Sequence, residues 1–358
     1  MLNWCEKDRY ASDLLRVDGS YGEGGGQIVR TAISLSAVTR KPIEIFNIRM
    51  NRRVSGLRRQ HLSALKAIVD MFQAKVDNLK IGADWIRFIP SPDKFEGADM
   101  KIDVQSAGSI PMILLALIPA VSLSGNSVRV QIIGGTDTKM APTTDYLRYV
   151  VGEAYRSVGI KFWLQILRRG YYPKGEGIIV AEIYPCRLPN SIELLTTRQL
   201  APKIASVCSH LPAHIGERQI SSALLRLEKN GVQCNNYSSS FETSSSPGSS
   251  VLVYSESEFG PYIGGDSLGE LGKSAEKVGS EAAEKFLESY RANVPVDFLL
   301  ADMLVVPLSL MNRISRYRVG RVTEHLRTNL HTASMITGCE YSIRPADNTY
   351  IVSIGGSR

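Results

Sequence analysis

The sequence predicts an α/β (α+β) protein built from three tandem βαβαββ units. Strand-like apolar stretches alternate with amphipathic helical stretches, and this order recurs with a period of roughly 85 residues, from Asp18 and again from Asp103. A third set of the same elements lies near the C-terminus, after a stretch that does not fit the repeat. With 358 residues, of which 44% are hydrophobic, the chain is long enough for two domains with ordinary cores.

The first unit follows a leader, residues 1–13, that we expect to be loosely attached. Its predicted elements are a strand ending at Asp18, a glycine loop, a helix at 26–39, a strand at 42–50, a basic loop, a helix at 58–73 and strands near 75–81 and 84–90. The second begins near Ile102 and continues with an apolar helix, the strand SVRVQIIGG, a helix at 144–158 and strands at 160–167 and 177–184.

The third unit is predicted to contain the apolar helix DFLLADMLVVPLSLM, the strand RYRVGRV, a helix at 323–336 and two closing strands, with a helix at 274–291 before them. In this arrangement the second helix of each unit starts beside His61, Asp145 and His325, respectively. We expect residues 1–187 and 273–358 to form one large domain.

Residues 188–272 are predicted to form an inserted small α/β domain. Its expected elements are the strand IELLTT, helices near 199–209 and 217–230, and the strands VQCNNY and SSVLVYSE. Its serine-rich stretch, 238–250, is predicted to be a mobile hairpin loop or linker without chemistry of its own.

The glycine loop DGSYGEGGGQIVRT joins the first strand to the first helix. Because Gly24, Gly25 and Gly26 carry no Cβ, backbone N–H groups can approach an anion at the positive end of the helix, although the glycines alone are equally compatible with a tight turn. Glu23 is placed to hold a divalent cation, and Arg30 to reach the same anion. These neighbours favour a phosphate site.

A basic loop follows about twenty residues later, in the stretch IRMNRRVSGLRRQH. Five arginines, Arg49, Arg52, Arg53, Arg58 and Arg59, precede Gln60 and His61. A run of this kind is usually a solvated surface. Here it is interrupted by serine and glycine between a strand and a helix, which favours a polyphosphate or RNA-phosphate site beside the glycine loop.

Overall charge and composition are consistent with an anionic partner, nucleic acid rather than a membrane. The formal net charge is +7, and proline interrupts the longest apolar run, so we expect no membrane span. The N-terminus has no signal-type apolar block, so we expect a cytoplasmic protein. The five cysteines are far apart and show no paired spacing, which argues against a zinc site or a disulfide framework.

His325 is the candidate nucleophile, within the motif TEHLRTN at a predicted helix start. The positive end of a helix favours the neutral imidazole, which is the nucleophilic form. A helix-capping or partly buried histidine would give the same pattern, and His61 has equal standing on sequence grounds.

Together, the motifs DGSYGEGGGQIVRT, RRVSGLRRQH, SAGS, GGTDTKMAP, RRGYYPKGEG, LLADMLVVPL and EHLRTN closely resemble the RNA 3′-terminal phosphate cyclase family, from Asp18 to Gly355. The resemblance implies three units like those of the enolpyruvyl transferase-like fold and a thioredoxin-like inserted domain. It also implies ATP and RNA with a 3′-terminal phosphate as substrates. A histidine would form enzyme–AMP, AMP would pass to the RNA phosphate, and the 2′-hydroxyl would displace AMP to close a 2′,3′-cyclic phosphate.

The same resemblance implies roles for individual residues. The nucleophile falls on His325 and the ligand for Mg²⁺ or Mn²⁺ on Glu23. The nucleotide- and phosphate-binding positions fall on Gly24, Gly25, Gly26, Gln27, Arg30, Arg49, Arg52, Gln60 and Asp302. Where bacterial members have an adenine-stacking tyrosine and a glutamine, this chain has Leu299 and Met303, so Phe298, Tyr262 or an apolar wall would hold the base.

Two other functions fit parts of the sequence. A catalytically inactive, cyclase-like RNA-binding assembly factor would lack the nucleophilic histidine, which this chain retains. An enolpyruvyl transferase would need neither the insert nor the EHLRTN histidine. The sequence does not decide between a monomer and a homodimer, nor does it identify the physiological RNA.

Overall fold

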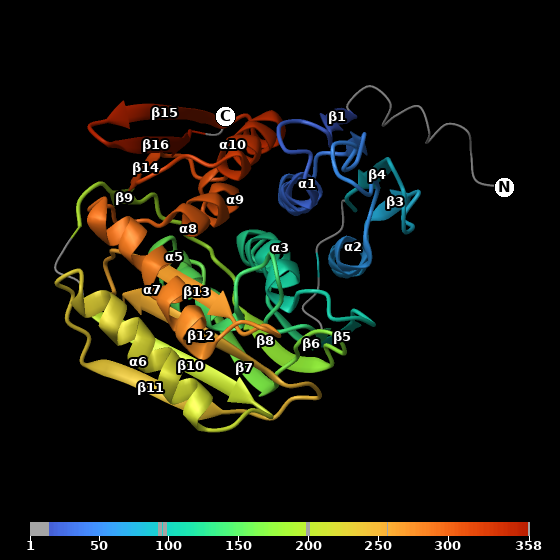
Figure 1. Cartoon of the computed structure of the whole chain (residues 1–358). Coiled ribbons are helices and arrows are strands. Elements are labelled where there is room, and N and C mark those ends of the chain that lie inside the picture. The colour runs from blue at the N-terminus through green and yellow to red at the C-terminus, as the bar shows by residue number, and fades with distance from the viewer. Residues whose placement is uncertain (1–13, 92–94, 96–98, 198–200, 256, 357–358) are drawn as a thin grey trace, which may run out of the picture.

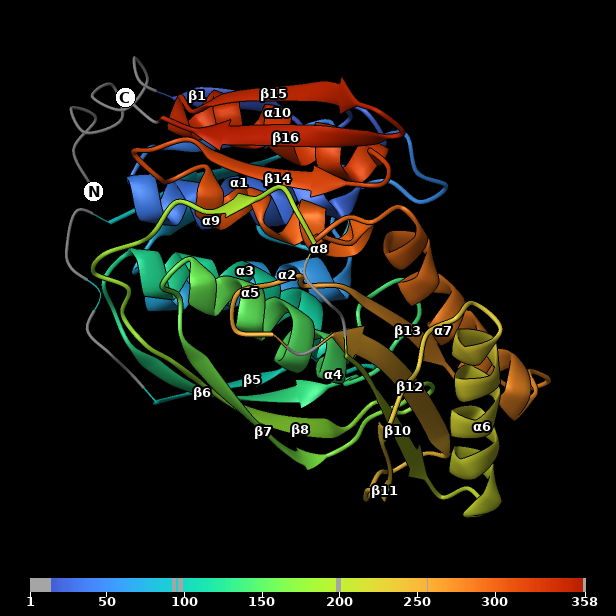
Figure 2. The ribbon, with the colours of Figure 1, turned by 90° about the vertical axis from the view of Figure 1, so that its left-hand side faces the viewer.

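The computed structural model describes residues 14–91, 95, 99–197, 201–255 and 257–356, and its α/β architecture agrees with the predicted class (Figure 1). Three four-stranded sheets lie on the outside, and the helices of the three units pack on one another between them (Figure 2). Helix α1 is central, because it contacts α2, α3 and α10. The predicted leader, 1–13, lies outside the described residues.

The first unit agrees closely with its predicted elements. It comprises β1 (Leu15–Asp18), α1 (Gly26–Thr39), β2 (Ile43–Phe46), α2 (Arg59–Met71), β3 (Lys75–Asp77) and β4 (Ile86–Ile89). The sheet order is β1-β2-β4-β3, in which β1 and β2 are parallel and the other pairs antiparallel.

The second unit repeats this topology, with sheet order β5-β6-β8-β7. Its elements are β5 (Asp99–Asp103), α3 (Ile110–Leu123), β6 (Val128–Gly134), one continuous helical run of α4 (Thr144–Tyr146), the π-helical η2 (Leu147–Val151) and α5 (Gly152–Ser157), then β7 (Phe162–Arg168) and β8 (Gly177–Ile183).

The third unit has the same topology but is interrupted after its first strand. It comprises β9 (Glu193–Leu194), α8 (Phe298–Met303), α9 (Val305–Leu308), β14 (Ser315–Val319), α10 (Glu324–Thr337), β15 (Glu340–Ala346) and β16 (Thr349–Gly355). The sheet order is β9-β14-β16-β15, and β9 runs parallel to β14. The stretch IELLTT, which the sequence assigned to the insert, therefore supplies the first strand of the third unit.

The insert has its own four-stranded sheet and its own apolar core. Its elements are β10 (Pro202–Ser209), α6 (His214–Glu228), β11 (Asn236–Phe241), β12 (Gly248–Ser255), β13 (Gly264–Leu268) and α7 (Ala275–Arg291). Helix α7 packs on α6, β12 and β13, although the sequence placed it with the third unit. Its apolar residues Phe286 and Leu287 are buried in the core of the insert.

Two predictions within the insert are wrong. The expected helix near 199–209 is strand β10 over its described part, and the serine-rich stretch 238–250 contributes to β11 and β12 rather than forming a linker. Two buried serine hydroxyls of this sheet are satisfied by one side chain, because Gln219 bonds Ser206 and Ser249, each at 2.8 Å.

Helix α10 begins with the EHLRTN motif and packs on the central helix α1. Thr323 caps α10 by accepting a hydrogen bond from the Leu326 N–H at 3.0 Å, and Gly338 ends the helix in the left-handed conformation, with φ of 77°. Its buried residues join one apolar core that extends through all three units. No helix among the described residues is both long and apolar enough to cross a bilayer.

Candidate active site

The glycine loop leaves the start of α1 open toward a cavity. Gly24 has φ of +57°, a conformation that favours glycine, and Gly26 leaves no room for a Cβ because the His61 imidazole packs against it. No side chain caps the first turn of α1, so its N–H groups are not occupied by a cap. Gly25, Gly26 and Gln27 line the cavity that lies in front of this turn.

Glu23, in the glycine loop, brings the basic loop and α10 together. Its Oε2 atom lies 2.7 Å from a guanidinium nitrogen of Arg52 and 2.9 Å from Nε2 of His325. Residues far apart in the sequence thus meet at one half-buried carboxylate, and the first and third units both contribute to the cluster.

A second contact fixes the backbone at His325. The Gln27 amide donates a hydrogen bond from Nε2 to the His325 carbonyl oxygen at 2.8 Å. Because a carbonyl can only accept, this bond also fixes the orientation of the amide, so that the Gln27 Oε1 atom is an acceptor. That oxygen is buried and has no partner among the described residues.

Two adjoining cavities meet at His325. We call the first, of about 650 Å³, the arginine cavity, because Arg30, Arg49, Arg52, Arg58 and Arg59 line it, together with Gln60 and His61. No acidic side chain lines it among the described residues. The second, of about 480 Å³, we call the apolar cavity; its wall includes Phe298, Leu299, Met303 and Tyr155. The residues common to both are Gln27, Arg30, Met112, Met140 and His325.

Burial and repulsion between like charges destabilise the charged side chains in the arginine cavity. Burial lowers the pKa of Arg30 to about 10, although attraction to Asp302 partly offsets it. The pKa of Arg49 is also lowered, first by burial and then by repulsion from Arg58 and Arg52. The pKa of His61 falls to about 3, through burial and the nearby arginines, so this imidazole is neutral at physiological pH. An anion in this cavity would relieve the repulsion.

Asp302, in the third unit, lines the apolar cavity and is connected to the first unit through Asn329. It accepts a hydrogen bond from Asn329, and Asn329 in turn accepts one from Thr31 of α1 at 2.7 Å. Burial raises the pKa of Asp302, while His325, Asn329 and Arg30 oppose the shift. The carboxyl group therefore faces both the candidate nucleophile and a cavity arginine.

His61 has a different environment from His325. It is 4% exposed, and its Nδ1 atom accepts a hydrogen bond from the Arg58 N–H at 3.3 Å at the start of α2. His325 lines both cavities and its side chain is half exposed. The sequence left these two histidines equal. The structure distinguishes a buried, helix-capping imidazole from an accessible one.

Comparison with known proteins identifies the family of this chain. The family described as RNA 3′-terminal phosphate cyclase matches residues 21–343. The chain belongs to the RNA 3′-terminal phosphate cyclase family. Similar proteins named RNA 3′-terminal phosphate cyclase include one from Pyrococcus furiosus, 37% identical over 92% of this chain and 95% of its own length. Those from Pyrococcus abyssi (39%; 91% and 94%) and Methanosarcina barkeri (38%; 95% and 100%) are comparable. This places the chain in the cyclase class of enzymes.

The structure brings most of the motif residues of this cyclase family to the two cavities. Gln27, Arg30 and His325 line both, Asp302 lines the apolar cavity, and Gly25, Gly26, Arg49, Arg52 and Gln60 line the arginine cavity. Glu23 contacts His325, whereas Gly24 lines neither cavity and makes the turn against Asn51. Tyr262, one of the residues considered for holding a base, is buried elsewhere and bonds the Glu258 carbonyl.

The sequence motifs did not single out Met140 and Asn329 as residues of this candidate site. Met140 lines both cavities although it is 97% exposed, and Asn329 connects Thr31 to Asp302. Both lie inside quoted motifs, GGTDTKMAP and EHLRTN, so their motif membership was the available signal. Arg58 and Arg59 belonged to the predicted basic loop without an individual role.

A divalent cation at Glu23 can be tested against the donors present. No group of three or more His, Cys, Asp or Glu side chains forms a metal cluster among the described residues. Mg²⁺ commonly binds through one or two carboxylates with substrate phosphate oxygens completing its shell. A single half-buried carboxylate beside a cavity without other acids fits that mode of binding.

Proposed function

We propose that this chain uses ATP to convert an RNA 3′-terminal phosphate into a 2′,3′-cyclic phosphodiester, with His325 as the residue that carries AMP. The observation that supports this most directly is the position of His325 at the junction of the arginine and apolar cavities. An adenosine fits the apolar side, and a chain of phosphates fits the arginine side, so that the α-phosphate would lie at the junction.

In the first step, Nε2 of His325 attacks the α-phosphorus of ATP, a P–N bond forms, and pyrophosphate leaves. Attack needs a lone pair on Nε2, so the Nε2 contact with Glu23 has to open first and the imidazole proton has to be on Nδ1. Arg30, Arg49 and Arg52 would bind the leaving pyrophosphate and stabilise charge on its oxygens. A divalent ion held by Glu23 would neutralise further phosphate charge.

In the second step, an oxygen of the RNA 3′-phosphate attacks the phosphorus of His325–AMP, the P–N bond breaks, and RNA(3′)pp(5′)A forms. In the third, the neighbouring 2′-hydroxyl oxygen attacks the RNA phosphorus and gives its proton to solvent, while the P–O bond to AMP breaks and AMP leaves. Activation is needed because AMP leaves readily, whereas an oxygen of a free phosphate monoester does not. The Gln27 bond to the His325 carbonyl would keep the imidazole in place through all three steps.

Transfer of label from α-labelled ATP tests the nucleophile. Wild-type protein should acquire an acid-labile label, and His325→Asn should acquire none. His331→Asn is the matched control, because His331 lies on the same helix α10 but stacks on Tyr21, with ring centroids 3.9 Å apart. Labelling of His325→Asn at the wild-type level would exclude His325.

The RNA end and the metal ligand need separate tests. Labelled wild-type protein should transfer AMP to RNA ending in 3′-phosphate and not to RNA ending in 3′-hydroxyl. An assembly factor without activity would transfer AMP to neither RNA.

Glu23→Gln should raise the Mg²⁺ or Mn²⁺ concentration for half-maximal labelling about tenfold, while the control Glu324→Gln, an exposed neighbour of His325, should not. An unchanged metal requirement in Glu23→Gln would remove Glu23 as a ligand.

A further inference from the structure

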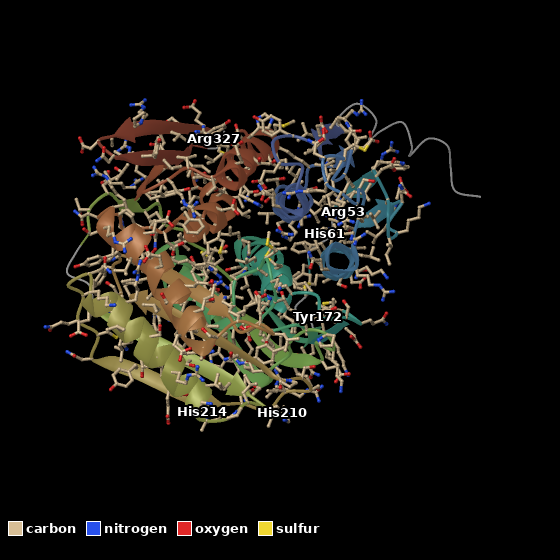
Figure 3. The ribbon with its side chains drawn as sticks, viewed as in Figure 1. Arg53, His61, Tyr172, His210, His214 and Arg327 are labelled. Atoms are coloured by element: carbon tan, nitrogen blue, oxygen red, sulfur yellow. The ribbon has the colours of Figure 1, made fainter. Side chains whose placement is uncertain are left out.

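The turn between β7 and β8 carries a quoted motif, RRGYYPKGEG, to which the proposed reaction gives no role. We call residues 170–176 the Tyr172 turn. Tyr172 is 81% exposed, the largest value for any aromatic residue that the structure describes, whereas the adjacent Tyr171 is buried. In Figure 3, Tyr172 lies on the same side of the view as Arg53 and His61 of the first unit.

The turn is held firmly at its start. Tyr171 packs its ring against Gly248 of β12, where a Cβ would overlap the ring. The preceding residue, Arg169, is fixed by three carboxylates, and the Gly170 N–H donates to the Thr136 hydroxyl at 3.0 Å. Tyr172 is therefore presented by a backbone with little freedom, which lowers the entropy cost of binding through its ring.

The far end of the turn rests on the wall of the arginine cavity. The Gly175 N–H bonds the Tyr171 carbonyl at 2.8 Å, and Gly175 packs so closely on Ala107 that a Cβ would lie 2.7 Å from the Ala107 Cα. The residues on either side of Ala107, Ser106 and Gly108, line the arginine cavity. The Tyr172 turn thus packs against the segment that supplies Ser106 and Gly108 to a cavity suited to terminal phosphates.

The turn carries one cation and one anion, the exposed side chains of Lys174 and Glu176. Lys174 is exposed and makes no ion pair with any described carboxylate, and the Arg168 guanidinium is held by the Glu176 carbonyl at 2.8 Å. Proteins bind single-stranded nucleic acid by stacking bases on an exposed aromatic ring and placing backbone phosphates near cations, and the turn supplies one of each in Tyr172 and Lys174.

We propose that the Tyr172 turn binds the single-stranded RNA next to its 3′-phosphate, with a base stacked on Tyr172 and a backbone phosphate near Lys174. This inference rests on the proposed function, because it assumes that the RNA 3′-phosphate occupies the arginine cavity. It adds a surface that selects RNA strands over isolated nucleotides. Contact with Tyr172 needs no particular base, since every base has a π-face.

The test compares two substrates: a 3′-phosphorylated oligoribonucleotide and a nucleoside 3′-monophosphate, which has no upstream nucleotide. Tyr172→Ala should raise the KM for the oligonucleotide about 5- to 150-fold and leave that for the monophosphate unchanged. Tyr172→Phe should retain the wild-type KM for both. Tyr237→Ala, on the exposed edge strand β11, is the control and should change neither.

Two measurements separate this proposal from the reaction itself. Labelling from ATP alone should be the same in Tyr172→Ala and wild type, and fluorescence anisotropy should show weaker binding of the 3′-phosphorylated oligonucleotide to Tyr172→Ala without ATP. Absence of labelling in the wild type would refute the proposed function and leave the anisotropy test standing. An unchanged oligonucleotide affinity, or an equal loss with the monophosphate, would overturn the Tyr172 proposal.

Discussion

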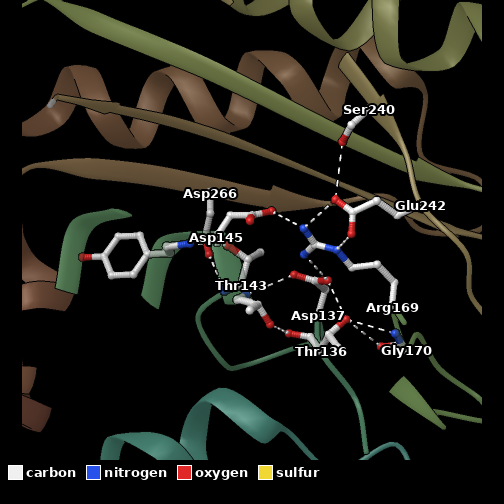
Figure 4. A network of polar contacts seen from close by, with 11 residues as sticks. Thr136, Asp137, Thr143, Asp145, Arg169, Gly170, Ser240, Glu242 and Asp266 are labelled. Carbon is white, nitrogen blue, oxygen red and sulfur yellow. Dashed lines mark hydrogen bonds and ion pairs between the residues drawn. The ribbon is translucent and has the colours of Figure 1, made fainter. Parts of the chain in front are cut away.

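Arg169 is 1% exposed and contacts three carboxylates, whereas the five arginines of the arginine cavity form one ion pair among the described residues, Arg52 with Glu23. Figure 4 shows the Arg169 cluster, in which the guanidinium lies 3.1 Å from Asp137, 2.8 Å from Asp145 and 2.8 Å from Glu242. Since Glu242 belongs to the insert and the other residues to the second unit, Arg169 joins the two.

The two regions differ in how the charge of their arginines is compensated. At Arg169 the protein itself supplies an excess of negative charge, and burial together with Asp137 raises the pKa of Asp145 even though Arg169 opposes the shift. In the arginine cavity the protein leaves positive charge uncompensated. Such a cavity is stabilised when an anion enters, which is what a phosphate-binding site requires.

Arg169→Met tests the comparison with the largest expected effect. The substitution leaves buried carboxylates without their cation, so the free energy of unfolding should fall by about 3–5 kcal/mol. Urea unfolding followed by circular dichroism measures it. Arg59→Met, in the cavity, is the control and should stay within about 0.5 kcal/mol of wild type. A loss below about 1 kcal/mol in Arg169→Met would contradict a structural role.

Arg49→Met should show the reverse behaviour. Labelling from ATP should slow about 100-fold, because one cation no longer stabilises charge on the departing pyrophosphate, whereas the free energy of unfolding should not decrease. Single-turnover labelling and urea unfolding on the same preparation separate the two. If Arg49→Met retains activity but loses stability, the roles of the two regions have been assigned incorrectly.

Pyrophosphate should stabilise the protein through the arginine cavity. At ten times its dissociation constant, a ligand that binds only the folded state adds about 1.4 kcal/mol to the free energy of unfolding. Thermal unfolding with increasing pyrophosphate measures this effect, which should weaken with added salt. The shift should be much smaller in Arg49→Met; an equal shift in both proteins would place the anion elsewhere.

His61 gives the smallest predicted effect. Its folded pKa of about 3 lies below the ordinary value of 6.5, so its contribution to stability is fully present above pH 6.5 and is lost as the pH falls toward 3. Between pH 6.5 and 5.5 this amounts to about 1 kcal/mol. His61→Asn, which keeps an acceptor for the Arg58 N–H, should flatten the dependence in urea unfolding by that amount; an unaltered slope would mean that His61 is not the group responsible.

The helices of the repeated units were predicted well because their ends are determined by residues nearby in the sequence. The glycine loop defines the start of α1, and Thr323 and Gly338 define the ends of α10. The insert was harder to predict. Strand β10 is almost continuously buried and rich in small residues, so it lacks the alternation that indicates a strand. Strand β12 was predicted from SSVLVYSE, whereas the serines of β11 were assigned to a loop or linker.

The sequence predicted which residues belong to the candidate site but not which of them contact one another. Sequence motifs indicated Glu23, Arg52 and His325, yet the bonds between Glu23 and the other two depend on how the units pack. The sequence assigned Arg49 to a phosphate site but gave no sign that Arg169 is a buried structural arginine. Both lie in basic stretches with glycine nearby, and only the tertiary structure supplies carboxylates to one and withholds them from the other.

The partners Gln27 and His325 are separated by 298 residues in the chain. At ordinary rates of synthesis, the second leaves the ribosome about 15–60 s after the first. A growing polypeptide therefore carries the basic half of the site long before His325 is made, and the proposed reaction with ATP has to wait until translation is nearly finished.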